Sequence, residues 1–134
     1  MLDASVVLKW FAAEQRGSVE ARGLRSEYEA GRLFVAVPSL MYLELLNVAG
    51  RRWRWDEEGL LEFAGALDDL LFEIGHPELH SVATWVARGL TANDAVYVAL
   101  AEERGVPLVT DDETILALAG EIIRPLAGES PSAS

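Results

Sequence analysis

The chain has 134 residues, with 11 basic against 22 acidic side chains and a formal net charge of −11. This length indicates one domain, and 51% apolar residues can build a core without covalent cross-links. The absence of cysteine excludes a disulfide scaffold, a thiolate zinc site and cysteine catalysis. It is typical of a reducing compartment.

No targeting or membrane segment is predicted. Asp3 stands where a secretion signal needs a basic region, and the longest charge-free apolar stretch, 33–43, is interrupted by Pro38 and Ser39. That stretch is about half of the ~20 residues of a membrane span. We expect a cytoplasmic protein with no membrane partner. The excess of acidic residues argues against nucleic-acid binding through many contacts between basic side chains and phosphates. Carboxylates that hold divalent cations can still present positive charge locally.

The apolar periodicity and the capping residues predict strands that alternate with helices. In chain order, these are a strand ending near residue 3, helix 18–30, strand 33–37, helix 39–52, helix 56–71, strand 72–74, helix 77–88, helix 91–104, strand 106–110, helix 112–118 and strand 122–123. Ser18, Ser39 and Thr91 are the expected N-caps, and Gly31 and Gly105 follow two helix ends. Such alternation favours an α/β fold with a parallel sheet covered on both faces.

One domain is expected over residues 1–126. Residues 127–134 are small and polar and are expected to form a disordered tail.

Candidate chemistry lies at the carboxyl ends of the strands, where open parallel sheets hold their functional crevice. Asp3 falls at the end of the first strand, and Asp111 and Asp112 follow the strand that ends at Thr110. Asp94 falls in the first turn of the preceding helix. The parallel layout predicts that these acids meet.

Glu44 is a fourth candidate, because it lies within the apolar stripe of its helix, between Leu40 and Val48. A carboxylate on such a stripe needs a partner. Four converging acids would repel one another unless cations lay among them. Mg²⁺ or Mn²⁺ suits such an all-oxygen set.

Taken singly, each acid also has a structural explanation. Thr91 and Asp94 fit a capping box, Glu44 fits a side chain that reaches solvent, and Asp3 and Asp112 fit a loop acid and an N-cap. Only the combination favours a functional site over these separate roles.

Other catalytic patterns have no support. His76 and His80 are four residues apart, but Pro77 places His76 before the helix, so a structural role is expected for both. Phosphate-binding glycine loops and the serine-hydrolase elbow do not occur in the sequence.

One basic cluster stands out, with Arg51, Arg52 and Arg54 interleaved with Trp53 and Trp55. The aromatic rings could stack on RNA bases while the guanidinium groups meet phosphates. Alternatively, the arginines favour a helix C-terminus and the tryptophans fill the core, or the cluster binds a protein partner.

Four motifs resemble those of the PIN domain, specifically the VapC-type toxin ribonucleases of toxin–antitoxin pairs. They are D-A-S-V-V-L-K-W-F at 3–11, P-x5-E-x2-N at 38–47, N-D-A-x-Y-x-A-L-A-E at 93–102 and P-L-V-T-x-D at 107–112. Their order and spacing cover residues 1–126.

This resemblance implies a three-layer α/β/α sandwich with a mainly parallel central sheet and metal-dependent endonucleolytic cleavage of RNA. It implies that Asp3, Glu44, Asp94 and Asp112 form the acidic quartet that holds Mg²⁺ or Mn²⁺. Ser5 and Thr110 match the hydroxyls that order the carboxylates, and Asp111 occupies a variable position.

The resemblance also implies a homodimer, an RNA substrate and inhibition by a VapB-type antitoxin protein. An alternative from another class is a non-catalytic PIN-like module that binds protein or RNA around a structural ion. Intact acidic positions argue against it, because carboxylates without an ion cost stability.

Overall fold

The computed structural model describes residues 1–2, 4–11, 18–110, 113–119 and 123–125. Asp3, Asp111, Asp112 and the tail expected over 127–134 lie outside this part. In chain order the elements are α1 (Ala4–Leu8), α2 (Ser18–Glu29), β1 (Ala36–Pro38), α3 (Leu40–Asn47), the π-helix η1 (Val48–Arg52), α4 (Glu57–Asp68), β2 (Glu73–Gly75), α5 (Leu79–Ala87), α6 (Ala92–Arg104), β3 (Leu108–Thr110), α7 (Glu113–Leu118) and β4 (Ile123–Pro125).

Every described strand pair is parallel. β1 pairs with β2 so that Val37 lies opposite Ile74, and β3 pairs with β4. The predicted first strand is a single parallel bridge between Leu2 and Val109, and the Val109 amide donates to the carbonyl of Met1 over 2.9 Å. The α/β class and its parallel pairing are therefore confirmed.

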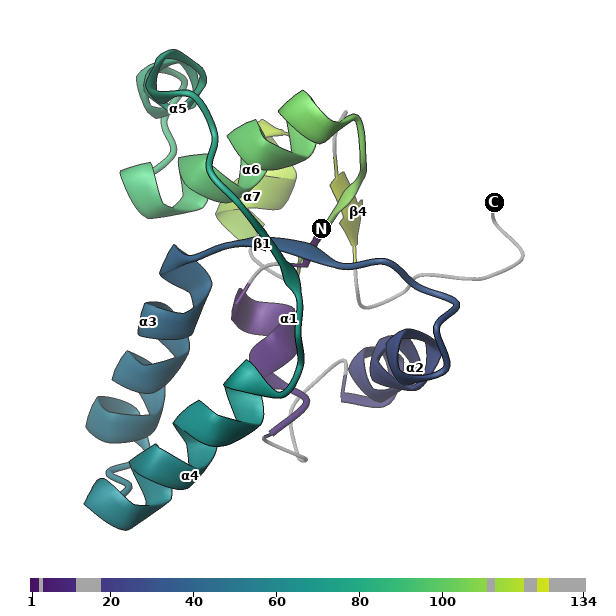
Figure 1. Ribbon diagram of the computed structural model, residues 1–134. Helices are drawn as coiled ribbons and strands as arrows, with labels where there is room; N and C mark the ends of the chain where they lie inside the picture. Colours follow the sequence, from purple (N-terminus) through teal and green to yellow (C-terminus); the bar gives the residue numbers. More distant parts are fainter. Residues whose placement is uncertain (3, 12–17, 111–112, 120–122, 126–134) are drawn as a thin grey trace.

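Helices lie on either side of β1 (Figure 1): α1, α3 and α4 are drawn below it, and α5, α6 and α7 above it. α1 packs against α3 and β3, whereas α6 packs against β1 and β3 and is covered by α5. The layered arrangement fits the predicted sandwich. Its core contains fully buried side chains from both sides, among them Val6, Val37, Leu45, Val98 and Leu108.

Several predicted helix ends are confirmed. The Thr91 hydroxyl accepts from the Asp94 amide at the start of α6 (3.2 Å), and Gly105 ends the helix in the left-handed region at φ 64°. Ser39 stands at the predicted N-cap position of α3, but the capping hydrogen bond expected of it is not formed. Its backbone is already helical (φ −59°, ψ −27°) and its side chain makes no capping bond, because the chain turns into α3 directly from Pro38.

Several helix boundaries differ from the prediction; the helix expected over 56–71, for example, ends at Asp68. The α-helical ladder of α3 stops at Asn47 and continues as η1, closed by a hydrogen bond from the Trp53 amide to the Val48 carbonyl over 3.1 Å. The helix predicted from Pro77 begins at Leu79. Glu78 stays extended because its amide donates to Glu103 on α6 (2.8 Å).

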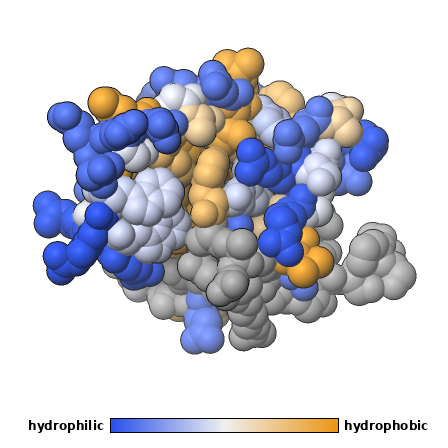
Figure 2. Space-filling model, turned by 90° about the horizontal axis from the view of Figure 1, so that it is seen from below, coloured by the Kyte–Doolittle hydropathy of each residue, from blue (hydrophilic) through white to orange (hydrophobic). Residues whose placement is uncertain are grey.

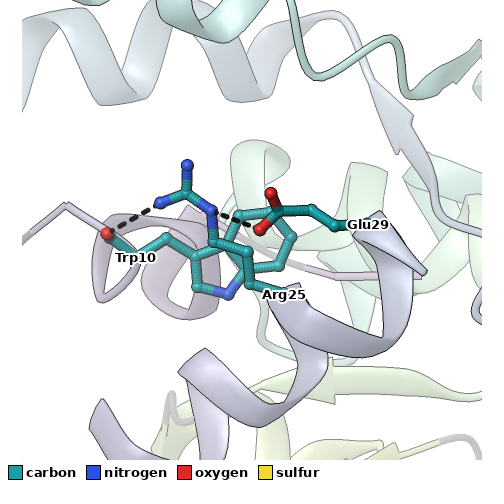
Figure 3. A network of polar contacts seen from close by, with 3 residues as sticks. All are labelled: Trp10, Arg25 and Glu29. Atoms are coloured by element: carbon teal, nitrogen blue, oxygen red, sulfur yellow. Dashed lines mark hydrogen bonds and ion pairs between the residues drawn. The ribbon is translucent and has the colours of Figure 1, made fainter.

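Arg25 ties α2 to the end of the first helical segment (Figure 3). Its guanidinium donates to the Trp10 carbonyl (3.3 Å) and to the Glu29 carboxylate (3.2 Å). The same group lies 5.8 Å from the Trp10 ring centroid, a favourable cation–π distance. Within the described chain, no helix is long and apolar enough to span a bilayer.

Tyr28 provides a second tie, because its hydroxyl donates to the carbonyl of Leu70 just after α4. Burial raises the pKa of this hydroxyl above its ordinary value of 10.0. Below pH 10 the hydroxyl is protonated and donates its hydrogen bond. The contribution of this bond to the free energy of unfolding is lost only as the pH rises through the raised pKa.

Replacement Tyr28→Phe should lower the free energy of unfolding by about 1 kcal/mol, because the Leu70 carbonyl loses its donor. Chemical denaturation at neutral pH measures the change. Tyr42→Phe is the matched control, since within the described residues the Tyr42 hydroxyl has no hydrogen bond. Equal losses for the two variants would contradict the assigned role.

Candidate active site

Glu44 occupies the half-buried border of α3. The fully buried positions of this helix are Met41 and Leu45. Each follows by one residue a position of the apolar stripe predicted from the sequence, which ran through Leu40 and Glu44. The Glu44 carboxylate accepts a hydrogen bond from the hydroxyl of Tyr97, a side chain only 2% exposed. The partner that a carboxylate in this position requires is therefore supplied by α6.

Asp94 lies in the first turn of α6 and is half-buried. It precedes Tyr97 by three residues, a spacing that places both on one face of the helix. Because Tyr97 reaches Glu44, the carboxylate of α3 is held on the side of α6 that carries Asp94. Glu44 and the helix face that carries Asp94 are therefore linked through Tyr97, although the two acids are 50 residues apart in sequence.

The predicted hydroxyls belong to two elements that pack against each other, α1 and β3. Thr110 is the last residue of β3 and is fully buried, and Ser5 is half-buried in α1. α1 packs directly against β3. Asp3 and Asp112 lie outside the described residues; Leu2, which precedes Asp3, and Thr110, two residues before Asp112, belong to paired segments.

The donor set is chemically suited to a hard divalent cation. Glu44 and Asp94 offer only oxygen ligands, which match Mg²⁺ or Mn²⁺ better than a thiolate- or imidazole-preferring metal. Among the described residues, which do not include Asp3 and Asp112, no group of three or more acids or histidines lies close enough to hold a metal ion. His76 and His80 are both exposed.

Tyr97 is the residue of this site whose contact sequence reasoning missed. Two signals point to it: the spacing of three from Asp94, and the need of Glu44 for a donor. Neither signal selects the partner by itself, because the pair is separated by 53 residues.

The basic cluster lies at the far end of the same helical segment as Glu44. Arg51 and Arg52 end η1, Arg54 follows it, and all three are exposed. Trp53 is partly buried and packs against the core, as the structural alternative expected, whereas Trp55 is 37% exposed.

The family of the chain follows from comparison with known proteins. The model of the PIN domain family matches residues 1–121, nearly the whole of the described fold and all four sequence motifs. The chain belongs to the PIN domain family.

Two curated relatives share 31% identity with it over 125 residues, covering 90% of each chain. Both are named Ribonuclease VapC1 and come from two strains of Mycobacterium tuberculosis, CDC 1551 and H37Rv. The chain is thus similar over almost its full length to VapC-type proteins.

A double-mutant cycle tests the link between Glu44 and Tyr97. Glu44→Ala and Tyr97→Phe should be non-additive by about 1.5 kcal/mol in the free energy of unfolding, because each change removes the same charge-assisted hydrogen bond. The measurement is chemical denaturation in the presence of a chelator. As a control, Tyr97→Phe with Glu62→Ala, an exposed acid on α4, should be additive. Additivity in both cycles would refute the link.

Proposed function

We propose that this chain is a divalent-metal-dependent endoribonuclease of the VapC type, the toxin of a type II toxin–antitoxin pair. The observation that carries the proposal is membership of the PIN domain family over residues 1–121, together with 31% identity to proteins named Ribonuclease VapC1. The oxygen-only character of Glu44 and Asp94 supports the same chemistry.

The acidic quartet of the proposal is Asp3, Glu44, Asp94 and Asp112, and its ion is Mg²⁺ or Mn²⁺. Two contacts support this assignment. The Glu44–Tyr97 hydrogen bond joins α3 to the face of α6 that carries Asp94. The Leu2–Val109 bridge joins the residue before Asp3 to the strand that precedes Asp112.

Each residue of the proposed site has a defined task. Asp3, Asp94 and Asp112 hold the principal ion, and Glu44 positions a second ion or the attacking water. The Tyr97 hydroxyl fixes the Glu44 carboxylate, while Ser5 and Thr110 orient neighbouring carboxylates. Bound divalent cations in such sites lower the pKa of water and neutralise charge on the leaving oxygen.

The proposed partners follow from the VapC assignment. The substrate is RNA, the inhibitor is a VapB-type antitoxin protein, and the working form is a cytoplasmic homodimer with no membrane partner. An acidic chain of net charge −11 supports recognition of an RNA shape or a short single-stranded motif over general affinity for nucleic acid.

Asp94→Asn should reduce Mn²⁺-dependent RNA cleavage by about 100-fold or more. Mutating residues that only hydrogen-bond to metal ligands already lowers metal affinity or activity by about 10–100-fold, and Asp94 is assigned as a ligand itself. Expression of the chain in a bacterial host followed by sequencing of RNA 5′ ends measures it, together with cleavage of purified RNA. The matched control is Asp69→Asn, at an exposed acid after α4.

The outcomes separate the two classes of function. New RNA ends with the parent chain and with Asp69→Asn, but not with Asp94→Asn, would establish the nuclease. Folded parent protein that produces no cleavage with Mg²⁺ or Mn²⁺ would refute it and favour the non-catalytic module.

Two adjacent acids provide a test of metal binding that does not depend on cleavage. Asp112→Asn should weaken Mn²⁺ binding by at least about 10-fold, whereas Asp111→Asn should leave it within about two-fold, because only the first is assigned as a ligand. Titration calorimetry or Mn²⁺ electron paramagnetic resonance measures both. The reverse order would refute the assigned quartet.

A further inference from the structure

Residues 51–55, here called the Arg–Trp turn, form the densest concentration of basic side chains in the chain. Three of its eleven basic residues fall within four positions, although the net charge is −11. The turn lies where η1 gives way to α4, on the face seen from below, where strongly hydrophilic side chains surround paler ones (Figure 2).

The three guanidinium groups of the turn are available to a ligand. Arg51, Arg52 and Arg54 are exposed, and within the described residues none of them forms an ion pair or hydrogen bond. By contrast, Arg25 pairs with Glu29, Arg32 with Glu27 and Arg104 with Glu73.

The acids that follow the turn have another role. Asp56 caps α4 by accepting from the Gly59 amide over 2.9 Å, and Glu57 and Glu58 lie in the first turn of that helix. Carboxylates there are stabilised by the helix dipole.

The two tryptophans form an anchored aromatic surface. The Trp53 and Trp55 ring centroids are 5.2 Å apart, tilted by 42°. Trp55 also packs edge-on to Phe63 at 5.3 Å, and Phe63 is buried in the core. Trp55 nevertheless keeps 37% of its surface exposed. A fixed indole with an open surface is suited to stacking on a nucleic-acid base.

The backbone holds these side chains in place. The Trp55 amide donates to the Ala49 carbonyl over 3.0 Å, which folds the turn back onto η1. Arg54 adopts the left-handed region at φ 56°. A non-glycine residue there costs about 1 kcal/mol and persists only where its surroundings fix it. The turn is therefore a preformed surface.

The distance between the Arg–Trp turn and Glu44 of the candidate active site matches a short stretch of single-stranded RNA. Arg51 follows Glu44 by seven residues on one continuous helical segment, α3 and η1, which corresponds to roughly 10 Å along its axis. At about 3.4 Å per stacked nucleotide, an RNA strand covers this distance with about three nucleotides.

We propose that the Arg–Trp turn binds the single-stranded RNA substrate beside the cleavage site, with Arg51 and Arg52 on phosphates and Trp55 on a base. This inference rests on the proposed function and extends it to substrate contact. Unpaired arginines alone could equally well bind an acidic protein partner. The open indole and the position two turns along the helix from Glu44 favour RNA.

The test is fluorescence anisotropy of a labelled mixed-sequence single-stranded RNA of about ten nucleotides, a typical site size, in a chelator so that no cleavage occurs. The double variant R51Q/R52Q should bind about 10-fold more weakly. Its plot of log affinity against log salt should be shallower by about 1.4, the value for two lost phosphate contacts on a single strand.

Two further variants separate charge from stacking. Trp55→Leu keeps every charge, so its affinity should fall about 10-fold with an unchanged salt slope. The matched charge control is R22Q/R88Q, which removes two exposed arginines from α2 and the end of α5 and should keep both affinity and slope. Circular dichroism verifies the fold of each variant.

Unchanged RNA affinity and slope in R51Q/R52Q, or an equal loss in R22Q/R88Q, would overturn the inference. Loss of binding to the antitoxin with unchanged RNA affinity would assign the turn to a protein partner instead.

Cleavage kinetics keep this inference distinct from the proposed function. R51Q/R52Q should raise KM at nearly constant kcat, whereas Asp94→Asn lowers kcat. If the parent chain cleaves no RNA with Mn²⁺, the proposed function fails, and the anisotropy measurements still decide whether the turn binds RNA.

Discussion

Leu2 and Val109 lie near opposite ends of the chain, and their parallel pairing fixes where the strand ends fall. The Val109 amide extends this pairing to Met1, and α1 begins two residues after the bridge and packs on β3. The carboxyl ends of parallel strands meet at one edge, so whatever follows them in sequence is delivered to the same place. A sheet with antiparallel pairing here would separate the acidic motifs.

The second constraint is the cost of placing a carboxylate against the core. Glu44 is half-buried on α3, and an unpaired carboxylate there would lose hydration without compensation. Tyr97 offsets that loss with a hydroxyl from α6, and the buried ring of the same residue packs in the core. One side chain thus contributes to both the packing of the sandwich and the geometry of the site.

The sequence predicts the elements whose signals are local. Thr91 and Gly105 mark helix ends through bonds within one turn, and both predictions agree with the structure. The π-helix after Asn47 has no such local mark. Ser39 carried the right residue type for a cap, but the chain from Pro38 enters the helix without an extended residue, so the hydroxyl has no role there.

In the candidate site, too, local features can be predicted from the sequence and long-range contacts cannot. Asp94 and Glu44 can be selected from sequence, because one follows a capping residue and the other interrupts an apolar stripe. The link between Glu44 and the face of α6 that carries Asp94 depends on the hydrogen bond from Tyr97, a contact across 53 residues that no periodicity encodes. Long-range side-chain partners of this kind require the fold.

An acidic chain that acts on a polyanion must concentrate positive charge where the substrate lies, because its average field is repulsive. The proposed cations do so at the strand ends, and the unpaired arginines of the Arg–Trp turn do so about two helical turns away. Elsewhere Arg25, Arg32 and Arg104 are engaged by carboxylates. On the proposed function, the clustering of positive charge at these two places favours RNA there over the otherwise acidic surface, so a strongly negative net charge increases selectivity for that path.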